Sequence, residues 1–163
     1  MDYDWITSAI ALGAAFDDRF DADELVAQGV THVVNMCVGQ TDDAYFARHQ
    51  GVHLASFGLA DGENEGDLGY QRLQGAVSYI TNVLAGDLDA KVYLHCAAGI
   101  SRSPAVMCGV LMRTERVSLT DALERVRRAR PIVNPHPAHL VALLRLAQDD
   151  QNATPAWTNG PQV

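Results

Sequence analysis

A cysteine and an arginine, separated by a run of small residues, are the side chains of this sequence best placed to do chemistry. The five residues Ala97-Ala98-Gly99-Ile100-Ser101 separate Cys96 from Arg102, and Ser103-Pro104 follow. The backbone N–H groups of a short curled loop can converge on one anion, and Gly99 permits the positive φ that such a curl needs. A guanidinium presents a planar fork that suits two phosphate oxygens. The pattern therefore predicts a phosphate-binding loop.

Cys96 stands at the start of this loop, where its thiol could act as a nucleophile. An ordinary cysteine, with a pKa of about 8.5, is only about 3 % ionised at pH 7. Loop amides, the Arg102 charge and the positive end of a following helix would all stabilise a thiolate. The alternative is a buried cysteine that ends a core strand. His95, Gly99 and Arg102 at fixed distances from Cys96 rarely arise together by chance, which favours the nucleophile.

The elements predicted around the loop would hold it at the edge of a sheet. Residues 91–95 predict a short strand that ends at the loop, and Pro104 suits the first turn of a helix. Further strands are expected at residues 6–12, 31–36 and 52–57. Strands that alternate with helices predict an α/β fold with a mostly parallel central sheet flanked by helices. Ligands bind at the carboxyl ends of strands in such folds, where Cys96 would lie.

Length and composition are those of one globular domain. The chain has 163 residues, of which 48 % are hydrophobic, enough for one substantial core. Apolar positions at helical spacing predict helices at residues 68–85, directly after the loop, at 118–130 and at 140–147. We expect a domain over residues 1–148 and a disordered tail over residues 149–163, which is polar and lacks periodicity.

Composition also limits the cellular setting and the partners. A net charge of −8 argues against a surface that coats nucleic acid. No apolar run approaches the length of a membrane span, and acidic residues near the start replace the basic segment of a secretory signal. Three cysteines, an odd number, favour free thiols over a disulfide framework. We therefore expect a cytoplasmic protein without a nucleic-acid or membrane partner.

The charges are distributed unevenly along the chain. Residues 1–90 carry a net charge of −12, whereas residues 91–130 carry +5. The positive segment begins at the loop, so it could draw a phosphorylated ligand to one face. An ordinary solvated helix face is an equally good interpretation of its arginines, which include Arg125, Arg127, Arg128 and Arg130.

A family resemblance extends these inferences. The segment His95-Cys96-Ala97-Ala98-Gly99-Ile100-Ser101-Arg102-Ser103 resembles the His-Cys-x5-Arg-Ser signature of cysteine-based protein phosphatases, in the form used by dual-specificity phosphatases. The likeness covers about residues 5–148 and includes the region from Leu25 to Asn35. It implies hydrolysis of phosphomonoesters on a phosphorylated protein, at phosphotyrosine with or without phosphoserine and phosphothreonine. It also implies a phosphocysteine intermediate and no cofactor.

Such a reaction needs a proton donor, because an alkoxide is a poor leaving group at neutral pH. The Gly-rich segment 58–67 is expected to be a loop, and it offers four acids that compete for the role: Asp61, Glu63, Glu65 and Asp67. The resemblance favours Asp61, which follows a strand and Leu59 as the general acid of the family does. Asp67, immediately before Leu68, better suits the cap of the next helix.

The resemblance also assigns roles to three residues near the nucleophile. Ser103 occupies the family's hydroxyl position and would stabilise the leaving thiolate, although it could simply begin a helix. His95 is expected to organise the loop through hydrogen bonds. Cys37 follows a strand as the redox partner of the nucleophile does in some members, and the alternative is a buried structural thiol. Asn134 lies in a loosely similar Pro-rich stretch and is assigned no role.

Other functions remain to be weighed. The same chemistry could act on a phosphoinositide, a sugar phosphate or an RNA 5′ phosphate, but the loop lacks the extra Lys or Arg that a polyanion would favour. Three other functions are alternatives: a phospho-binding module without turnover, sulfur transfer and arsenate reduction. The intact Cys96, Arg102 and candidate acid fit each of them less well than they fit a phosphatase. His136 and His139 have no accompanying carboxylate ligands, so we expect capping or surface roles for them and no metal.

Overall fold

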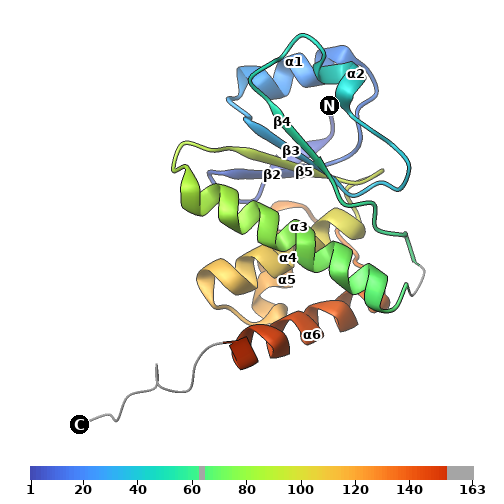
Figure 1. Ribbon diagram of the computed structural model, residues 1–163, viewed down its shortest axis with the longest axis vertical. Coiled ribbons are helices and arrows are strands. Elements are labelled where there is room, and N and C mark those ends of the chain that lie inside the picture. The colour runs from blue at the N-terminus through green and yellow to red at the C-terminus, as the bar shows by residue number, and fades with distance from the viewer. Residues whose placement is uncertain (63–64, 154–163) are drawn as a thin grey trace.

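A five-stranded sheet divides the computed structural model, which describes residues 1–62 and 65–153, into two unequal layers (Figure 1). The strands lie in the order β1-β2-β5-β3-β4. Their bounds are β1 Tyr3–Trp5, β2 Ile10–Gly13, β3 His32–Asn35, β4 His53–Ser56 and β5 Val92–His95. β1 pairs antiparallel with β2, and the other neighbouring pairs are parallel. The predicted mostly parallel α/β sheet is confirmed.

The start of the sheet differs from the prediction of a strand over residues 6–12. The chain instead forms a hairpin, in which β1 precedes the predicted strand and residues 6–9 make the turn. The Thr7 hydroxyl accepts hydrogen bonds from the backbone N–H groups of Ala9 and Ile10, at 3.2 and 3.0 Å. Because a threonine side chain can satisfy turn amides in this way, the apolar residues around it need not extend a strand.

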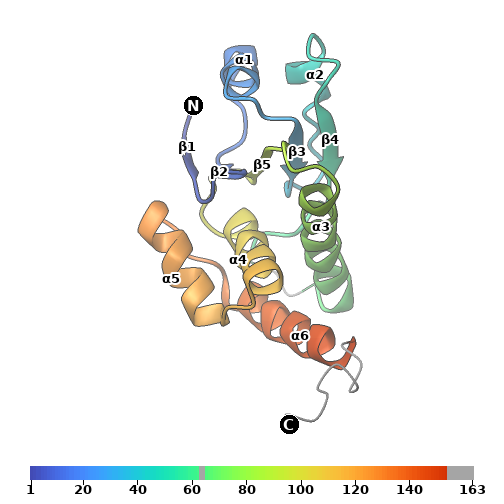
Figure 2. The same ribbon diagram turned by 90° about the vertical axis from the view of Figure 1, so that its left-hand side faces the viewer.

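Helices cover both faces of the sheet (Figure 2). α1 Arg19–Ala27 and α2 Asp43–Phe46 lie on one face. The other face carries the four longer helices α3 Asp67–Gly86, α4 Arg102–Glu115, α5 Leu119–Ala129 and α6 Pro137–Ala153. None of the helices in the described part of the chain is long and apolar enough to cross a membrane.

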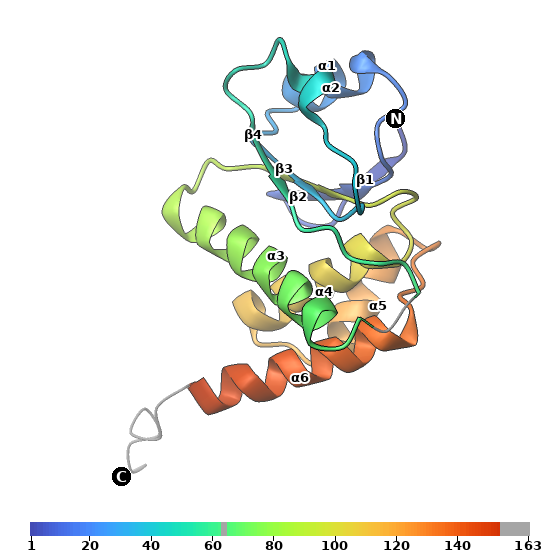
Figure 3. The ribbon, with the colours of Figure 1, turned by 45° about the vertical axis from the view of Figure 1, so that its right-hand side comes forward.

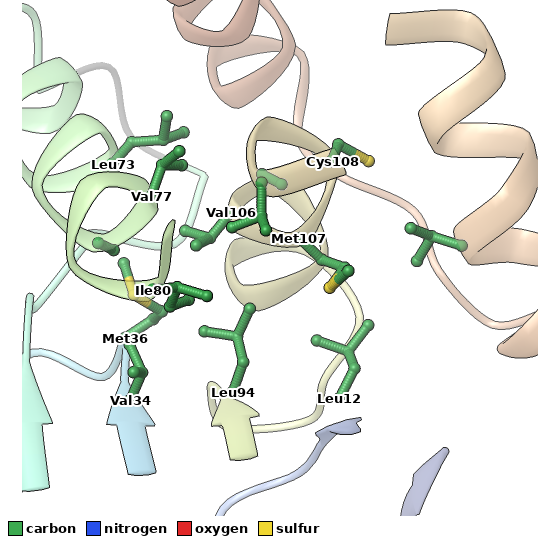
Figure 4. Packing of buried hydrophobic residues seen from close by; sticks show 14 of the residues in the cluster. Leu12, Val34, Met36, Leu73, Val77, Ile80, Leu94, Val106, Met107 and Cys108 are labelled. Carbon is green, nitrogen blue, oxygen red and sulfur yellow. The ribbon is translucent and has the colours of Figure 1, made fainter. Parts of the chain in front are cut away.

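The larger core lies between the sheet and the layer of four helices. Figure 4 shows Leu12 and Leu94 of the strands pointing toward α4, which carries Met107, while Val34 lies below Ile80 of α3. Every residue of α4 from Arg102 to Leu111 is buried, so this helix is fixed on all sides. A helix packed in this way holds its N-terminal N–H groups in place, which a preformed anion site requires.

The last helix is longer than the sequence pattern predicts. α6 continues to Ala153, so residues 149–153 of the predicted disordered tail are helical. Asp149 accepts a hydrogen bond from the Tyr70 hydroxyl, and Asp150 pairs with Arg113 at 2.8 Å. These contacts with α3 and α4 stabilise a polar segment whose own sequence shows no helical periodicity. The remainder of the predicted tail, residues 154–163, lies outside the described residues.

Candidate active site

The loop between β5 and α4 is compact and is fastened to its surroundings. Its Ala97 carbonyl accepts from the Ala15 N–H at 3.0 Å, and its Ile100 carbonyl accepts from the Asn134 N–H at 2.8 Å. Gly99 has φ +64°, and a Cβ there would lie 2.5 Å from the Gly13 carbonyl oxygen. Only glycine fits this close approach, as the sequence pattern suggested.

Arg130 holds the outer side of the loop. Its Nε donates to the Gly99 carbonyl at 3.0 Å, and its Nη2 donates to the Ala98 carbonyl at 3.2 Å. The same guanidinium pairs with Asp2 at 2.7 Å and Asp4 at 2.8 Å. The Arg130 side chain is only 2 % exposed. It therefore lies neither on a solvated helix face nor on a surface that attracts a ligand, the two interpretations that the charge pattern offered. The sequence missed this role because the partners of Arg130 are at least 31 residues away.

The Cys96 thiol lies buried at the base of the loop. The Ser103 hydroxyl donates to its Sγ at 3.2 Å. Burial acts to raise the pKa of Cys96, but the Ser103 hydroxyl and N–H, the Arg102 charge and the Gly99 N–H outweigh burial, and the pKa is lowered. A lowered pKa increases the fraction of nucleophilic thiolate at neutral pH.

Arg102 and Asp61 meet beside the thiol. Arg102 Nη2 lies 3.4 Å from the Asp61 carboxylate, and Nη1 donates to the Leu59 carbonyl at 3.4 Å. The Arg102 side chain is 9 % exposed, whereas that of Asp61 is 55 % exposed. Arg102 Nε is buried and has no hydrogen-bond partner among the residues that the structure describes, which leaves one N–H for an anion. Figure 3 shows the segment that carries Asp61 crossing from β4 toward the start of α6.

The other acids of this segment are engaged elsewhere or lie outside the described residues. Glu65 accepts from the Ala60 N–H and pairs with Arg72. Asp67 pairs with Arg145 of α6, and the N-cap position of α3 is Gly66, so the prediction that Asp67 caps this helix is wrong. Its carboxylate turns to a neighbouring helix instead of to the backbone. Glu63 lies outside the described residues.

His95 belongs to a buried network that the sequence did not reveal. Its Nε2 lies 3.0 Å from the Asp42 carboxylate, and Asp42 also accepts from Asn35 Nδ2 at 3.1 Å. The Asn35 amide oxygen accepts from the Cys37 N–H at 2.7 Å. The network therefore connects the end of β3 with the residue before the nucleophile. Asp42 immediately precedes α2, and the burial of this acid at 7 % exposure is a feature that only the fold discloses.

Cys37 is a buried thiol close to the nucleophile. Cys37, Cys96 and Cys108 are all free, and Cys108 lies within α4. Burial raises the pKa of Cys37, the Arg102 charge opposes this effect, and the Cys96 charge adds to it. A redox pair of Cys37 and Cys96 stays a prediction.

The histidines near the start of α6 have different surroundings. His136 Nδ1 accepts from the Ala138 N–H at 3.2 Å, which confirms a capping role. His139 is only 3 % exposed, so the expected capping or surface role is wrong for this residue. Within residues 1–62 and 65–153, no group of three or more His, Cys, Asp or Glu is arranged to hold a metal ion. Asn134 contributes its backbone N–H to the loop, while its side chain is exposed.

Solved structures share this fold. The crystal structure of human DUSP28 superposes with a TM-score of 0.77 at 23 % identity, covering 93 % of this chain and 96 % of that one. The human tyrosine phosphatase-like serine/threonine/tyrosine-interacting protein gives a TM-score of 0.76 at 23 % identity, covering 92 % of this chain and 98 % of that one. At these identities the likeness is one of fold.

Sequence relatives establish the family. Mouse dual specificity protein phosphatase 13B is 35 % identical over 123 residues, which are 74 % of this chain and 61 % of that protein. Mouse dual specificity protein phosphatase 1 is 31 % identical over 140 residues, 86 % of this chain but only 36 % of that protein. The chain thus spans between about a third and three fifths of these relatives. The family model described as "Dual specificity phosphatase, catalytic domain" matches residues 14–149, and the chain belongs to this family.

Proposed function

We propose that this chain hydrolyses phosphomonoesters on proteins through a phosphocysteine intermediate. The observation that carries the proposal is the buried Cys96 thiol, which accepts a hydrogen bond from Ser103 at 3.2 Å and has a lowered pKa. Arg102 lies beside it with an unpaired N–H among the described residues, and its guanidinium contacts Asp61. The loop thus brings together a nucleophile, a guanidinium that can bind an anion and a proton donor.

In the first step, the Cys96 thiolate attacks phosphorus in line with the ester oxygen. The S–P bond forms as the P–O ester bond breaks, and protonated Asp61 gives its proton to the leaving oxygen. Arg102 and the loop N–H groups bind the equatorial oxygens, where charge accumulates. The products are the free alcohol or phenol and a phosphocysteine.

In the second step, water hydrolyses the phosphocysteine. The Asp61 carboxylate takes a proton from water as its oxygen attacks phosphorus, and the P–S bond breaks. The departing thiolate accepts the hydrogen bond from Ser103, which stabilises its charge. Inorganic phosphate leaves, and Asp61 is again protonated for the next cycle. His95, held by Asp42, would keep the first residue of the loop in place throughout.

The loop surface favours a phosphoprotein over a polyanionic substrate. Ala97 and Ala98 are exposed and neutral, and Ile100 is 37 % exposed. No loop side chain other than Arg102 can carry a positive charge. The same fold accommodates a lipid headgroup in another protein, because PTPMT1 in complex with PI(5)P superposes with a TM-score of 0.76 at 19 % identity. The substrate class therefore needs a direct comparison.

A panel of phosphorylated compounds tests the substrate class. Peptides with phosphotyrosine, phosphoserine or phosphothreonine are assayed for phosphate release beside phosphoinositide vesicles, a sugar phosphate and RNA with a 5′ phosphate. We expect the phosphopeptides to be turned over with the highest kcat/KM. Faster turnover of a non-protein phosphate would overturn the substrate class, and phosphate binding without turnover of any compound would indicate a binding module.

A further inference from the structure

The Glu65 side chain joins the segment that carries the proposed general acid to helix α3. Its Oε2 accepts from the Ala60 N–H at 2.9 Å, and its Oε1 accepts from Arg72 Nη1 at 2.7 Å. Ala60 immediately precedes Asp61 in the chain. We infer that Glu65, held by Arg72, is a positioning residue for Asp61. This inference rests on the proposed function, in which Asp61 is the proton donor.

The bridge from Ala60 through Glu65 to Arg72 is partly buried and closely packed. The Glu65 side chain is 17 % exposed and that of Arg72 is 33 % exposed. Gly69 packs closely against Glu65, since a Cβ on Gly69 would lie 3.0 Å from the Glu65 Cβ. Because each carboxylate oxygen has its own donor, rotation of the carboxylate would break both hydrogen bonds. A partly exposed ion pair adds little stability, so its main effect would be on geometry.

The hydrogen bond from Ala60 to Glu65 is one of three that hold the backbone just before Asp61 in the described structure. On the sheet side, the Leu59 N–H donates to the Met36 carbonyl at 3.0 Å, and the Leu59 carbonyl accepts from Arg102. On the helix side, Glu65 holds the next N–H, that of Ala60. Asp61 itself is half exposed and its carboxylate contacts Arg102 at 3.4 Å. Its place over the loop therefore depends on the backbone that Glu65 fixes.

Loss of the bridge should weaken proton donation and leave the nucleophile intact. Neither Glu65 nor Arg72 contacts Cys96 or Arg102 through a hydrogen bond or ion pair in the described structure. A misplacement of about 1 Å in a reacting group can reduce a rate by about 100-fold. The loss should depend on the leaving group, because a good leaving group needs little protonation.

The test compares two aryl phosphates of similar shape with the full chain. Phenyl phosphate has a poor leaving group, and dinitrophenyl phosphate has a good one. Glu65→Ala should lose about 10- to 100-fold in kcat/KM with phenyl phosphate but less than about threefold with dinitrophenyl phosphate. Asp61→Ala should show the same asymmetry with a larger loss. Glu65→Gln keeps an acceptor for the Ala60 N–H and should recover part of the loss.

Asp67→Ala is the matched control, because it breaks an ion pair two residues away that does not contact Ala60. It should retain about the wild-type rates on both substrates. Arg72→Met serves as the second variant if Glu65→Ala does not fold, and it should reproduce the asymmetry in weaker form. Equal losses of Glu65→Ala or Arg72→Met on both substrates, or the same asymmetry in Asp67→Ala, would overturn the inference. A wild-type chain without turnover, or an active Cys96→Ser variant, would instead overturn the proposed function and the inference with it.

Discussion

Replacing Arg130 by methionine should both destabilise the fold and loosen the phosphate loop. Methionine fills a similar apolar volume but leaves the Gly99 and Ala98 carbonyls without the donors that now lie at 3.0 and 3.2 Å. A buried group that loses its hydrogen bond, as the Gly99 carbonyl would, costs about 1–3 kcal/mol, and the partly buried Ala98 carbonyl costs less. The side chains of Asp2 and Asp4 are 64 % and 43 % exposed, so water replaces most of the stabilisation that they lose with the Arg130 ion pairs.

We therefore expect the free energy of unfolding of Arg130→Met to fall by roughly 2–5 kcal/mol. Urea unfolding measures this difference, and titration with inorganic phosphate measures the state of the loop. Phosphate should bind more weakly, because without Arg130 the loop carbonyls are free to rotate, and the backbone N–H groups of the same peptide units are then no longer held toward the bound anion. Arg128→Ala is the control, since Arg128 lies in the last turn of α5, two residues before Arg130, but is 76 % exposed and forms an exposed ion pair with Glu124.

Two outcomes would refute this reasoning about Arg130. An Arg130→Met variant as stable as Arg128→Ala would show that the Gly99 and Ala98 carbonyls find other donors. Unchanged phosphate affinity in a destabilised Arg130→Met variant would show that the guanidinium supports the fold without shaping the loop.

The remaining predictions concern the thiol and its buried neighbours. Because the pKa of Cys96 is lowered, its alkylation by iodoacetamide should begin at a lower pH than that of an ordinary thiol. Ser103→Ala should shift the dependence of the alkylation rate on pH to higher pH, and identical dependences in the two proteins would rule out this role of Ser103. The folded state holds the Cys96 proton less tightly than the unfolded state, so the Cys96 thiolate should stabilise the fold at a pH above the unfolded pKa. This contribution to the free energy of unfolding should disappear as the pH falls through the folded pKa. Urea unfolding of wild type and Cys96→Ser across pH measures it, and parallel pH dependences of the two proteins would contradict it. Asp42→Ala removes the acceptor of His95 Nε2 and leaves Asn35 Nδ2 with the Gln40 carbonyl at 3.4 Å alone, so it should lower the free energy of unfolding by roughly 2–5 kcal/mol. Asp42→Asn keeps an acceptor and should lose less; equal losses in urea unfolding would show that the acceptor is not what matters.

Contiguous features of the sequence were sufficient to infer the centre of the candidate site. Cys96, Gly99 and Arg102 lie within seven residues, so their chemistry could be inferred from types and spacing alone. The parallel sheet followed from alternating strands and helices for the same reason, because periodicity is a local property. Asp61 needed the family resemblance, since four acids share its segment and their composition does not separate them.

Long-range partners account for what the sequence did not predict. Arg130 was assigned to a charged face because nothing near it indicates that its donors reach Asp2, 128 residues away. Asp42 and His95 are 53 residues apart, and a buried acid is recognisable only when its partner is known. Residues 149–153 are helical through contacts with α3 and α4, although their own pattern is that of a polar tail.

The most direct test of the proposed chemistry is to trap the intermediate on Cys96. Wild-type protein mixed with dinitrophenyl phosphate and quenched rapidly should carry one phosphoryl group on Cys96, located by mass spectrometry of its peptides. Cys96→Ser should bind inorganic phosphate but have no turnover. A phosphoryl group on another residue, or undiminished turnover by Cys96→Ser, would contradict the cysteine mechanism.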